Sequence, residues 1–338
     1  MSNFVSVIIP TRDRAGELAQ TLQALERSCC RDRDTYTAEL IVVDNASADE
    51  TAKVVKEFRS ARLNVRYVFE SRKGRATCIN RALLEAKGDI ILLLDDDVRP
   101  QPGWIPTMCG PIWEGRADAV AGGVTMAPHL RRNWMEDFHR GFLTTTDGWD
   151  PGGMKIMLGA NCAFSRNVLD KVPAFDPELG AGTLGFCEDI LFSAQVVNAG
   201  YRLTAVLDHP VTHHFDPSRL SRDSFMRRAE AEGRSRAYIA HHWEQREIRF
   251  PFLRVCDAFV RLQMKRRLPG ARWPHKEGIA EWEFWSICRL AFRQQFTRER
   301  RRARNYGEAR ALKPLKEAFR TDRDVSDSSL PVSTTESS

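Results

Sequence analysis

Residues 89–97 of the chain, DIILLLDDD, decide its fold. The five apolar residues at 90–94 form the kind of continuous run that is typical of a strand buried on both faces of a sheet. Three aspartates follow this run directly, although adjacent carboxylates repel one another and a buried strand does not require them. The stretch therefore predicts a central strand that ends in a cluster of acidic side chains.

Similar apolar runs lie on either side of this strand and alternate with helical patterns. Strands are expected at residues 4–9, 39–43, 65–69, 89–94, 119–125 and 201–207. Helices are expected at 15–27, after a capping box at Ser47–Glu50, at 76–86, and from Glu188 onward. Apolar strands that alternate with helices indicate an α/β fold, with a mainly parallel sheet covered by helices on both faces.

Charge is distributed unevenly along the 338 residues. Residues 1–214 carry 24 basic and 28 acidic side chains, whereas residues 215–320 carry 26 and 13. We therefore expect a catalytic or binding domain at 1–215, a basic helical region rich in aromatic residues at 216–320, and a disordered Ser/Thr-rich tail at 321–338. The overall composition, 42% hydrophobic and 28% charged, excludes a fibrous or wholly disordered chain.

The sequence also bears on the cellular compartment. Residues 4–9 have the pattern of a strand rather than of a secretory signal, and no segment reaches the roughly 18 consecutive apolar residues of a membrane-spanning helix. The eight cysteines show no Cys-x-x-Cys spacing. We expect reduced thiols in a cytoplasmic protein.

The aspartate run is the strongest chemical signal. A divalent cation would relieve the repulsion among its carboxylates, because Mg²⁺ and Mn²⁺ prefer oxygen ligands and complete their shells with substrate phosphates. In an Asp-x-Asp arrangement, Asp95 and Asp97 can point to the same side of an extended strand end. The alternative interpretation is a solvated acidic turn.

Other polar groups follow the carboxyl ends of neighbouring strands, where ligands of parallel sheets bind. Asp44 and Asn45 could bond a base or a ribose, although a plain turn before the Ser47 cap is the more common case for these two residues taken alone. Gly74 permits close backbone approach, and the basic loop at Arg72–Arg75 before a helix suits a diphosphate, unless it is merely an exposed loop.

Two later motifs are candidates for catalysis and metal binding. Glu188 and Asp189 begin a helix, where an ionised carboxylate is stabilised and could act as a general base. Ordinary charge complementarity at a helix start is the alternative. His213 and His214 follow the last expected strand, and a neutral imidazole could complete a metal shell, although a structural histidine is the more common case.

Together these motifs resemble the family 2 glycosyltransferases with the GT-A fold. The resemblance extends from Val5 to about Phe215 and rests on motifs found in the same order along the chain. They are VIIPTR at 7–12, IVVDNAS at 41–47, Gly74-Arg75, LDDD at 94–97, GANCAF at 159–164, FDPELG at 175–180 and Glu188-Asp189.

The resemblance implies a nucleotide-diphosphate sugar as donor, with uridine diphosphate as the expected carrier, a Mg²⁺ or Mn²⁺ ion, and inversion at the anomeric carbon. The implied site residues fall into three groups. They are Pro10, Thr11, Arg12, Asp44, Asn45, Gly74, Arg75, Asp95 and Asp96 for the donor, Asp95, Asp97 and His213 for the metal, and Asp189 with Glu188 for catalysis. Asp13 stands where asparagine is frequent in the family, and Asp96 adds a third carboxylate, so the motif does not specify which aspartate binds metal.

The implied reaction transfers a sugar to an acceptor hydroxyl in the synthesis of a glycan, a polysaccharide or a glycolipid. One alternative is a sugar-1-phosphate nucleotidyltransferase, although residues 10–14 lack the glycine run expected after its first strand. Another is a non-catalytic scaffold that binds a sugar nucleotide or a membrane.

The basic region interleaves arginines with aromatic residues between positions 250 and 305. This pattern suits an anionic membrane surface, which places the protein at the inner face of a membrane as a peripheral protein. Aromatic residues packed on the catalytic domain are an equal alternative. Nucleic-acid binding ranks third, because no recognised motif supports it.

Overall fold

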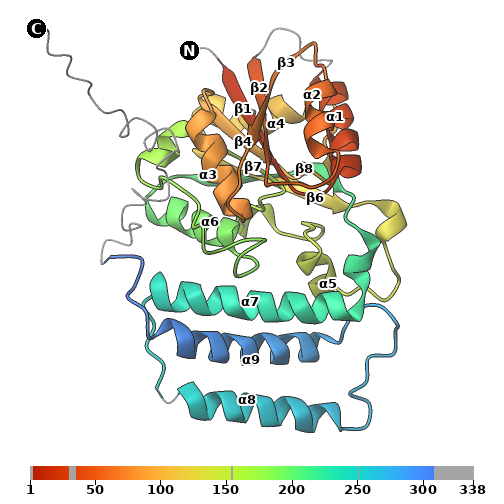
Figure 1. The fold of residues 1–338 in the computed structure, drawn as a ribbon, viewed down its shortest axis with the longest axis vertical. Helices are drawn as coiled ribbons and strands as arrows, with labels where there is room; N and C mark the ends of the chain where they lie inside the picture. The colour runs from red at the N-terminus through yellow and green to blue at the C-terminus, as the bar shows by residue number, and fades with distance from the viewer. Residues whose placement is uncertain (1–2, 30–35, 154, 250, 308–338) are drawn as a thin grey trace, which may run out of the picture.

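The strands of the described residues form one eight-stranded sheet, and three long helices lie below it in Figure 1, a view of the computed structural model. The structure describes residues 3–29, 36–153, 155–249 and 251–307. The expected tail at 321–338 lies outside these residues. The predicted α/β class is confirmed, as is a helical part at the carboxyl-terminal side.

The sheet order is β3-β2-β1-β4-β7-β6-β8-β5. The strands are β1 (Phe4–Thr11), β2 (Thr37–Asp44), β3 (Leu63–Phe69), β4 (Ile90–Leu94), β5 (Val98–Arg99), β6 (Ala119–Met126), β7 (Asn161–Ser165) and β8 (Leu203–His213). The first four pair in parallel, so their carboxyl ends meet at one edge. This half of the sheet matches the sequence prediction closely.

The other half is mixed rather than parallel. β7 inserts between β4 and β6 and is antiparallel to both, and no strand was expected there because its run of five residues is short. β8 extends to His213, six residues beyond the expected end. Its later part contains Asp208, His209 and Pro210 and pairs with β6 after a register shift near Gly122, so it lacks an apolar pattern.

Helices cover both faces of the sheet, as predicted. α1 (Ala15–Cys29), α2 (Thr51–Glu57) and α4 (Trp104–Trp113) pack on one face, and α3 (Arg75–Glu85) and α6 (Glu188–Asn198) pack on the other. Strand residues alternate between the two layers: Val7 and Leu92 face the first group of helices, and Ile8 and Leu93 face the second. Burial on both faces explains the continuous apolar runs.

The predicted capping box before α2 is wrong in detail. The Ser47 hydroxyl accepts a hydrogen bond from the backbone N–H of Asp13 (2.9 Å), and the helix begins only at Thr51. The Asp49 carboxylate accepts from the Thr51 N–H at 3.0 Å, and the N-cap residue Glu50 makes no side-chain cap bond. The segment after β2 therefore ties the β1 loop to the β2 loop instead of opening a helix.

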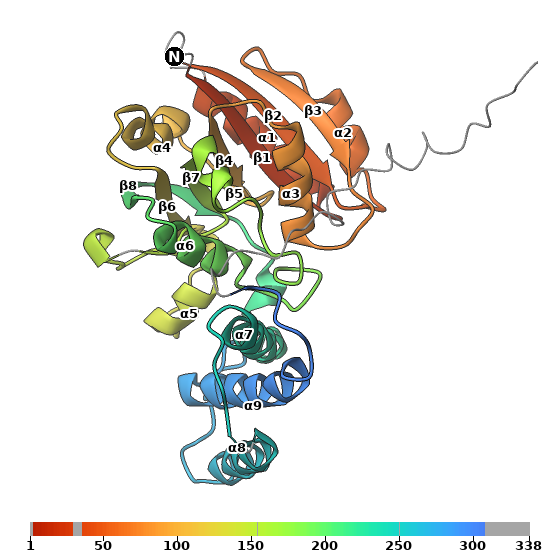
Figure 2. The same cartoon turned by 90° about the vertical axis from the view of Figure 1, so that its left-hand side faces the viewer.

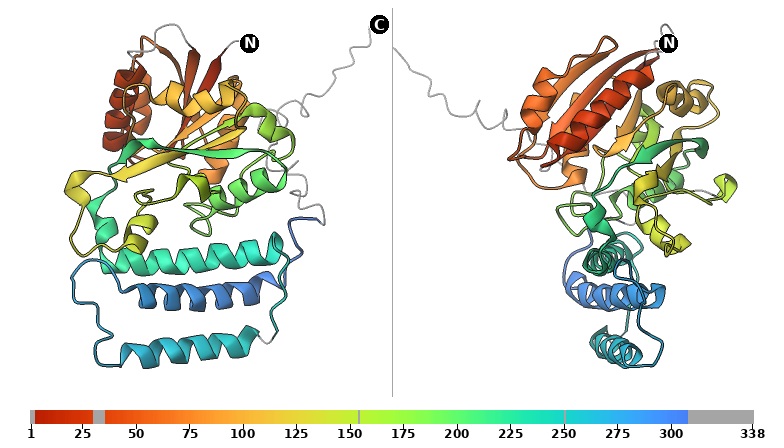
Figure 3. Two further views of the ribbon diagram at one scale, coloured as in Figure 1. Left: turned by 180° about the vertical axis from the view of Figure 1, so that it is seen from behind. Right: turned by 90° about the vertical axis from the view of Figure 1, so that its right-hand side faces the viewer.

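The helical part stacks α7 (Arg222–His242), α9 (Glu281–Glu299) and α8 (Pro251–Arg266) in that order away from the sheet, as Figures 2 and 3 show from other sides. α7 and α9 approach closely at Gly233, where an added Cβ would lie 2.2 Å from the Cys288 carbonyl oxygen. Among the described residues, no helix is long and apolar enough to cross a membrane.

Five short helical elements lie in the connections between the larger helices and strands of the described residues. They are α5 (Asp137–Phe142), η1 (Pro128–Leu130), η2 (Pro151–Gly153), η3 (Arg166–Asp170) and η4 (Pro217–Leu220). α5 and the residues that follow it pack with α7 and α9 around Phe225 and Phe284. The helical part therefore shares a core with the loops at the carboxyl edge of the sheet.

Candidate active site

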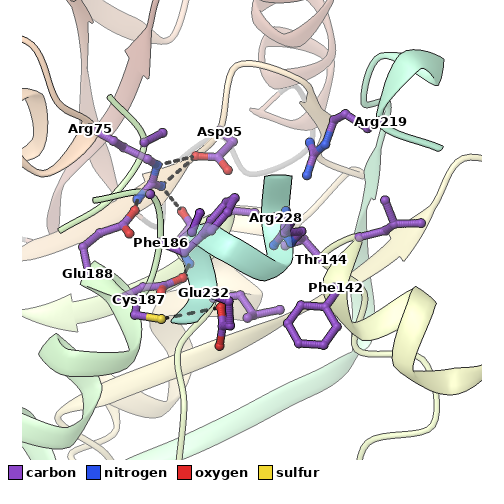
Figure 4. A pocket seen from close by; sticks show the side chains of 18 of the residues that line it. Arg75, Asp95, Phe142, Thr144, Phe186, Cys187, Glu188, Arg219, Arg228 and Glu232 are labelled. Carbon is purple, nitrogen blue, oxygen red and sulfur yellow. Dashed lines mark hydrogen bonds and ion pairs between the residues drawn. The ribbon is translucent and has the colours of Figure 1, made fainter. Parts of the chain in front are cut away.

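A cavity of about 900 Å³ lies between the carboxyl edge of the sheet and α7 (Figure 4). The predicted residues that line it are Pro10, Thr11, Arg12, Asn45, Arg75, Asp95, Asp96, Asp97, Glu188, Asp189 and His213. Most of the candidate residues therefore lie around one cavity, although they come from six separate stretches of the chain.

The three aspartates form a turn between β4 and β5 rather than an extended strand end. Asp96 is buried inside that turn, and both of its oxygens are engaged. Oδ2 accepts from the Thr11 hydroxyl at 2.7 Å, and Oδ1 accepts from Arg14 at 3.0 Å. Burial raises the pKa of Asp96 to about 6. Its bonds link the β1 loop to the β4 loop, which is a structural role.

Asp97 is also buried, but one of its oxygens has no hydrogen-bond donor. Oδ2 accepts from Arg14 at 3.0 Å, whereas Oδ1 faces the Nε2 atom of His213 at 3.3 Å. The Nδ1 atom of His213 lies 3.1 Å from the Leu143 carbonyl oxygen, which can only accept, so Nδ1 must carry the proton. In a neutral His213, Nε2 and Asp97 Oδ1 are then two acceptors facing each other.

Either a second proton on His213 or a cation between the two groups satisfies this arrangement. Burial disfavours the charge of Asp97, but the His213 imidazole and the Arg14 guanidinium outweigh burial and hold its pKa well below the ordinary value. The donor set of one carboxylate oxygen and one imidazole nitrogen fits Mg²⁺ or Mn²⁺. Within the described ranges, no three Asp, Glu, His or Cys side chains form a complete metal shell, so substrate oxygens would have to supply the remaining ligands.

Arg75, at the start of α3, binds two acidic stretches together. Its guanidinium donates to Asp95 at 2.7 Å, to Glu188 at 3.0 Å and to the Gly159 carbonyl oxygen at 2.8 Å. Burial opposes the charge of Arg75, but these carboxylates raise its pKa above the usual value. Asp95 therefore turns toward Arg75, while Asp97 turns toward Arg14 and His213.

Asp189 lies at the cavity wall in the first turn of α6. Its carboxylate accepts from the backbone N–H groups of Gly159 (2.9 Å) and Ile190 (2.8 Å), which fix its orientation. Burial raises its pKa, and burial with the neighbouring charge of Asp189 raises the pKa of Glu188 to about 7. For both carboxylates, desolvation therefore outweighs the stabilisation expected at a helix start.

Two predicted residues do not line the cavity, and a third is held by the fold. The buried Asp44 accepts from the Tyr67 hydroxyl at 2.8 Å and from the Ser47 N–H at 2.9 Å. Gly74 precedes α3 with a φ of +130°, which favours glycine. Asn45 reaches the cavity, but its amide bonds the backbone of Glu70, Arg72 and Gly74 and so shapes the basic loop.

Six arginines of the cavity lining were not predicted as site residues: Arg14, Arg219, Arg227, Arg228, Arg234 and Arg236. Arg14 pairs with Asp96 and Asp97, and Arg219 lies 3.9 Å from Asp97. Arg228 reaches the cavity from α7. Arg14 follows the first strand directly and could have been inferred from its position, but Arg219 and Arg228 lie in a basic region without a motif.

A cavity of about 900 Å³ at the carboxyl edge of an α/β sheet is where such folds bind their ligands. The chain belongs to glycosyl transferase family 2, because residues 6–173 match the sequence model of that family. The resemblance described from the motifs is therefore confirmed.

One curated relative is the undecaprenyl-phosphate 4-deoxy-4-formamido-L-arabinose transferase of Proteus mirabilis, which is 31% identical over 178 residues. The alignment covers 50% of this chain and 51% of the relative, so the chain spans about half the length of that protein. Because the alignment covers only half of each protein, the relative's substrates are not assigned to this chain.

Two solved structures share the fold. The mannosyltransferase PcManGT from Pyrobaculum calidifontis, in complex with GDP-Man and Mn²⁺, has a TM-score of 0.59 at 18% identity and matches over 87% of this chain and 86% of that one. S. aureus TarS 1-349, in complex with UDP-GlcNAc, has a TM-score of 0.51 at 16% identity, with coverages of 91% and 93%. These likenesses establish the GT-A fold of the chain.

The Arg75 bridge predicts a pH-dependent loss of stability in Arg75→Met. Removing a buried ion-pair partner lowers the free energy of unfolding by about 3–5 kcal/mol at pH 8, because Asp95 and Glu188 are left charged and uncompensated. An acid whose pKa is raised in the folded state loses stability as pH rises from its unfolded value through its folded value. The deficit should therefore shrink toward pH 5, where Glu188 is protonated.

Urea unfolding at pH 5 and pH 8 measures this difference. Arg81→Met is the matched control on the same helix, since its i,i+4 pair with Glu85 is partly exposed and contributes about 0–1 kcal/mol. A deficit for Arg75→Met that is the same at both pH values would show that Arg75 does not compensate these carboxylates.

Proposed function

We propose that this family 2 glycosyltransferase is an inverting, metal-dependent enzyme that transfers a sugar from a nucleotide-diphosphate donor, with uridine diphosphate as the carrier, to an acceptor hydroxyl. The observation that carries the proposal is the convergence of Asp95, Asp97, Arg75 and Asp189 on one cavity. Displacement at an anomeric carbon needs two parts. One is positive charge that neutralises the departing diphosphate, and the other is a carboxylate that accepts the proton of the acceptor hydroxyl.

In this mechanism Asp189 takes the proton of the acceptor hydroxyl. The hydroxyl oxygen attacks the anomeric carbon from the face opposite the diphosphate, and the bond from that carbon to the leaving oxygen breaks, so the configuration inverts. The two N–H bonds from Gly159 and Ile190 hold the carboxylate in place. Glu188 supports the reaction indirectly by anchoring Arg75, which lines the donor side.

The acidic and basic groups at the donor side have separate proposed roles in binding the metal ion and the diphosphate. Asp97 and His213 would hold Mg²⁺ or Mn²⁺, which supplies Lewis-acid neutralisation of the diphosphate charge. Arg14 and Arg219 lie beside Asp97 and add positive charge to the same wall. The PcManGT complex with Mn²⁺ supports metal use in this fold. Asp95 and the β1 loop at Pro10–Arg12 remain the proposed donor contacts.

Asp189→Asn tests the catalytic assignment. We expect it to lower the transfer rate by about 10²–10⁴-fold, because a general base contributes on that order, while the dissociation constant of UDP stays within about twofold. The measurement is nucleoside-diphosphate release from a panel of UDP- and GDP-sugars, with a mixture of simple glycoside acceptors. Wild-type release should rise with pH above the range in which an ordinary aspartate ionises, because burial raises the pKa of Asp189 and only its ionised form can act as the base.

The same assay separates the competing functions. Release of pyrophosphate instead of a nucleoside diphosphate would indicate the nucleotidyltransferase. If wild type and Asp189→Asn both bind a nucleotide sugar but neither releases a product from it, the non-catalytic scaffold is favoured. Unchanged transfer in Asp189→Asn would remove Asp189 from the mechanism.

The metal assignment predicts different outcomes for two neighbouring aspartates. Asp97→Asn should weaken Mn²⁺ binding in the presence of UDP by at least about tenfold, since even indirect partners of a metal contribute 10–100-fold in affinity. Asp96→Asn should keep Mn²⁺ binding and instead reduce stability, because Asp96 holds Thr11 and Arg14. Calorimetric titration of Mn²⁺ measures both variants, with Asp118→Asn as a remote control. Equal Mn²⁺ affinity in wild type and Asp97→Asn would contradict the assignment.

We also infer that α8 rests on an anionic membrane surface. Six of the nine exposed large apolar side chains of the described residues lie on or just after this helix: Phe252, Leu253, Phe259, Val260, Met264 and Leu268. The opposite side of α8 packs on α9 through Ala258 and Leu262. α8 is the outermost helix in Figure 2, so its apolar stripe faces away from the protein.

The basic residues of α8 indicate that its apolar stripe binds an anionic lipid surface. Arg254, Arg261 and Lys265 lie on the same helix, and Arg267 follows it directly. An apolar stripe flanked by basic side chains is the pattern of helices that lie in the interface of anionic bilayers, where each basic residue near the surface contributes about 1 kcal/mol.

Sedimentation of the full chain with phosphatidylglycerol vesicles tests this placement. Phe259→Glu combined with Met264→Glu should reduce binding more than about tenfold, because two apolar side chains no longer enter the bilayer. Leu84→Glu is the matched control, since Leu84 is 51% exposed, as is Phe259, but lies on α3. No binding by wild type, or concentration-dependent dimers that Phe259→Glu abolishes, would contradict a membrane-bound α8.

A further inference from the structure

Helix α7 contributes Arg227, Arg228, Arg234 and Arg236 to the cavity lining, and the proposed transfer mechanism uses none of them. Arg228 lines the cavity together with Phe142, Thr144 and Phe186. In Figure 4 it lies with Phe142 and Thr144 on the helical wall, away from Arg75 and Glu188. The cavity therefore has a second, positively charged wall opposite the acidic edge of the sheet.

Arg228 differs from the other arginines of the lining. Arg234 and Arg236 pair with Glu230 and Glu232 along α7, and Arg227 is exposed. Arg14, Arg75 and Arg219 each lie within 4.0 Å of a carboxylate of the aspartate run. In the described part of the chain, no carboxylate lies within that distance of Arg228, and its Nε atom is buried without a hydrogen-bond acceptor. Burial lowers its pKa to about 10, so it remains charged at neutral pH.

The nearest acid on the same helix is already committed. Glu232, one turn further along α7, accepts from Arg236 at 2.6 Å and faces the Cys187 thiol at 3.7 Å. Phe186 and Phe142 lie 4.1 and 5.9 Å from the Arg228 guanidinium, measured to their ring centroids. The rings hold the guanidinium by cation–π contacts but leave its N–H donors without an anion.

We propose that Arg228 is the centre of an oxyanion subsite that binds a phosphate or carboxylate group of the acceptor substrate. A planar guanidinium in a desolvated wall is suited to such groups, because it offers paired N–H donors and a permanent charge. In the proposed mechanism the donor phosphates lie near Arg14, Arg75 and Arg219. Arg228 lies on the opposite wall, so we assign its anion to the acceptor substrate. This assignment of the acceptor class rests on the proposed glycosyl transfer.

The first arm of the test measures the anion itself. Inorganic phosphate is titrated into the full chain saturated with UDP and Mg²⁺, and again without nucleotide, while the melting temperature is followed. We expect saturable stabilisation of wild type, and about a tenfold or greater loss of phosphate affinity in Arg228→Met, since a hydrogen bond to a charged group contributes on that order. Arg228→Lys should retain part of the affinity.

Arg289→Met is the matched control, because it removes the same charge from an exposed position on α9 outside the cavity. Its phosphate affinity should equal that of wild type. Phosphate binding that is the same in wild type and Arg228→Met, or that is absent from wild type, would overturn the subsite. A lower affinity in Arg289→Met as well would assign the effect to net charge and would also overturn it.

The second arm separates the two substrates that could carry the anion. Dissociation constants for UDP-glucose and UDP-glucuronic acid should be the same in Arg228→Met as in wild type. Selective weakening of UDP-glucuronic acid would place the anion on the donor sugar and overturn the acceptor assignment. If no nucleotide sugar binds to wild type, the proposed function fails, whereas the phosphate titration without nucleotide still reports on Arg228.

Discussion

The structure depends on keeping a group of carboxylates together where a buried parallel sheet ends. Asp96 and Asp97 are almost completely buried, and isolated charges in such surroundings are strongly unfavourable. Arg14 compensates these two, and Arg75 compensates Asp95 and Glu188. The fold therefore supplies cations from the loop after β1 and from the start of α3, and each cation joins segments that lie far apart in the sequence.

Compensation is incomplete at one point, and that point is chemically distinctive. Asp96 has a donor for each oxygen, which makes it part of the loop structure. Oδ1 of Asp97 faces the Nε2 atom of His213, and this contact requires either a second proton on His213 or a cation between the two groups. The three adjacent aspartates therefore have different roles, because each carboxylate faces a different part of the structure. The sequence motif alone leaves these roles open because they depend on Arg14 and His213.

Sequence reasoning succeeds where burial imposes a simple pattern. The apolar runs of β1, β2 and β4 predict the parallel half of the sheet and the edge where the site forms. Prediction fails where contacts between distant segments decide the outcome. β8 contains Asp208 and Pro210, yet it is a strand because β6 pairs with it. Ser47 lies where the sequence predicts a helix cap, but its hydroxyl oxygen accepts a hydrogen bond from the N–H of Asp13 instead.

The helical part explains why the site could be only half predicted. The family model covers residues 6–173, and the donor-side groups lie within that segment or shortly after it. The opposite wall comes from α5, η4 and α7, whose sequence shows only an excess of arginine over acid. An excess of charge does not distinguish Arg228, which has no acid partner among the described residues, from Arg236, which is paired with Glu232. That distinction arises from packing, so features that select one acceptor over another can vary without altering the motifs that define the family.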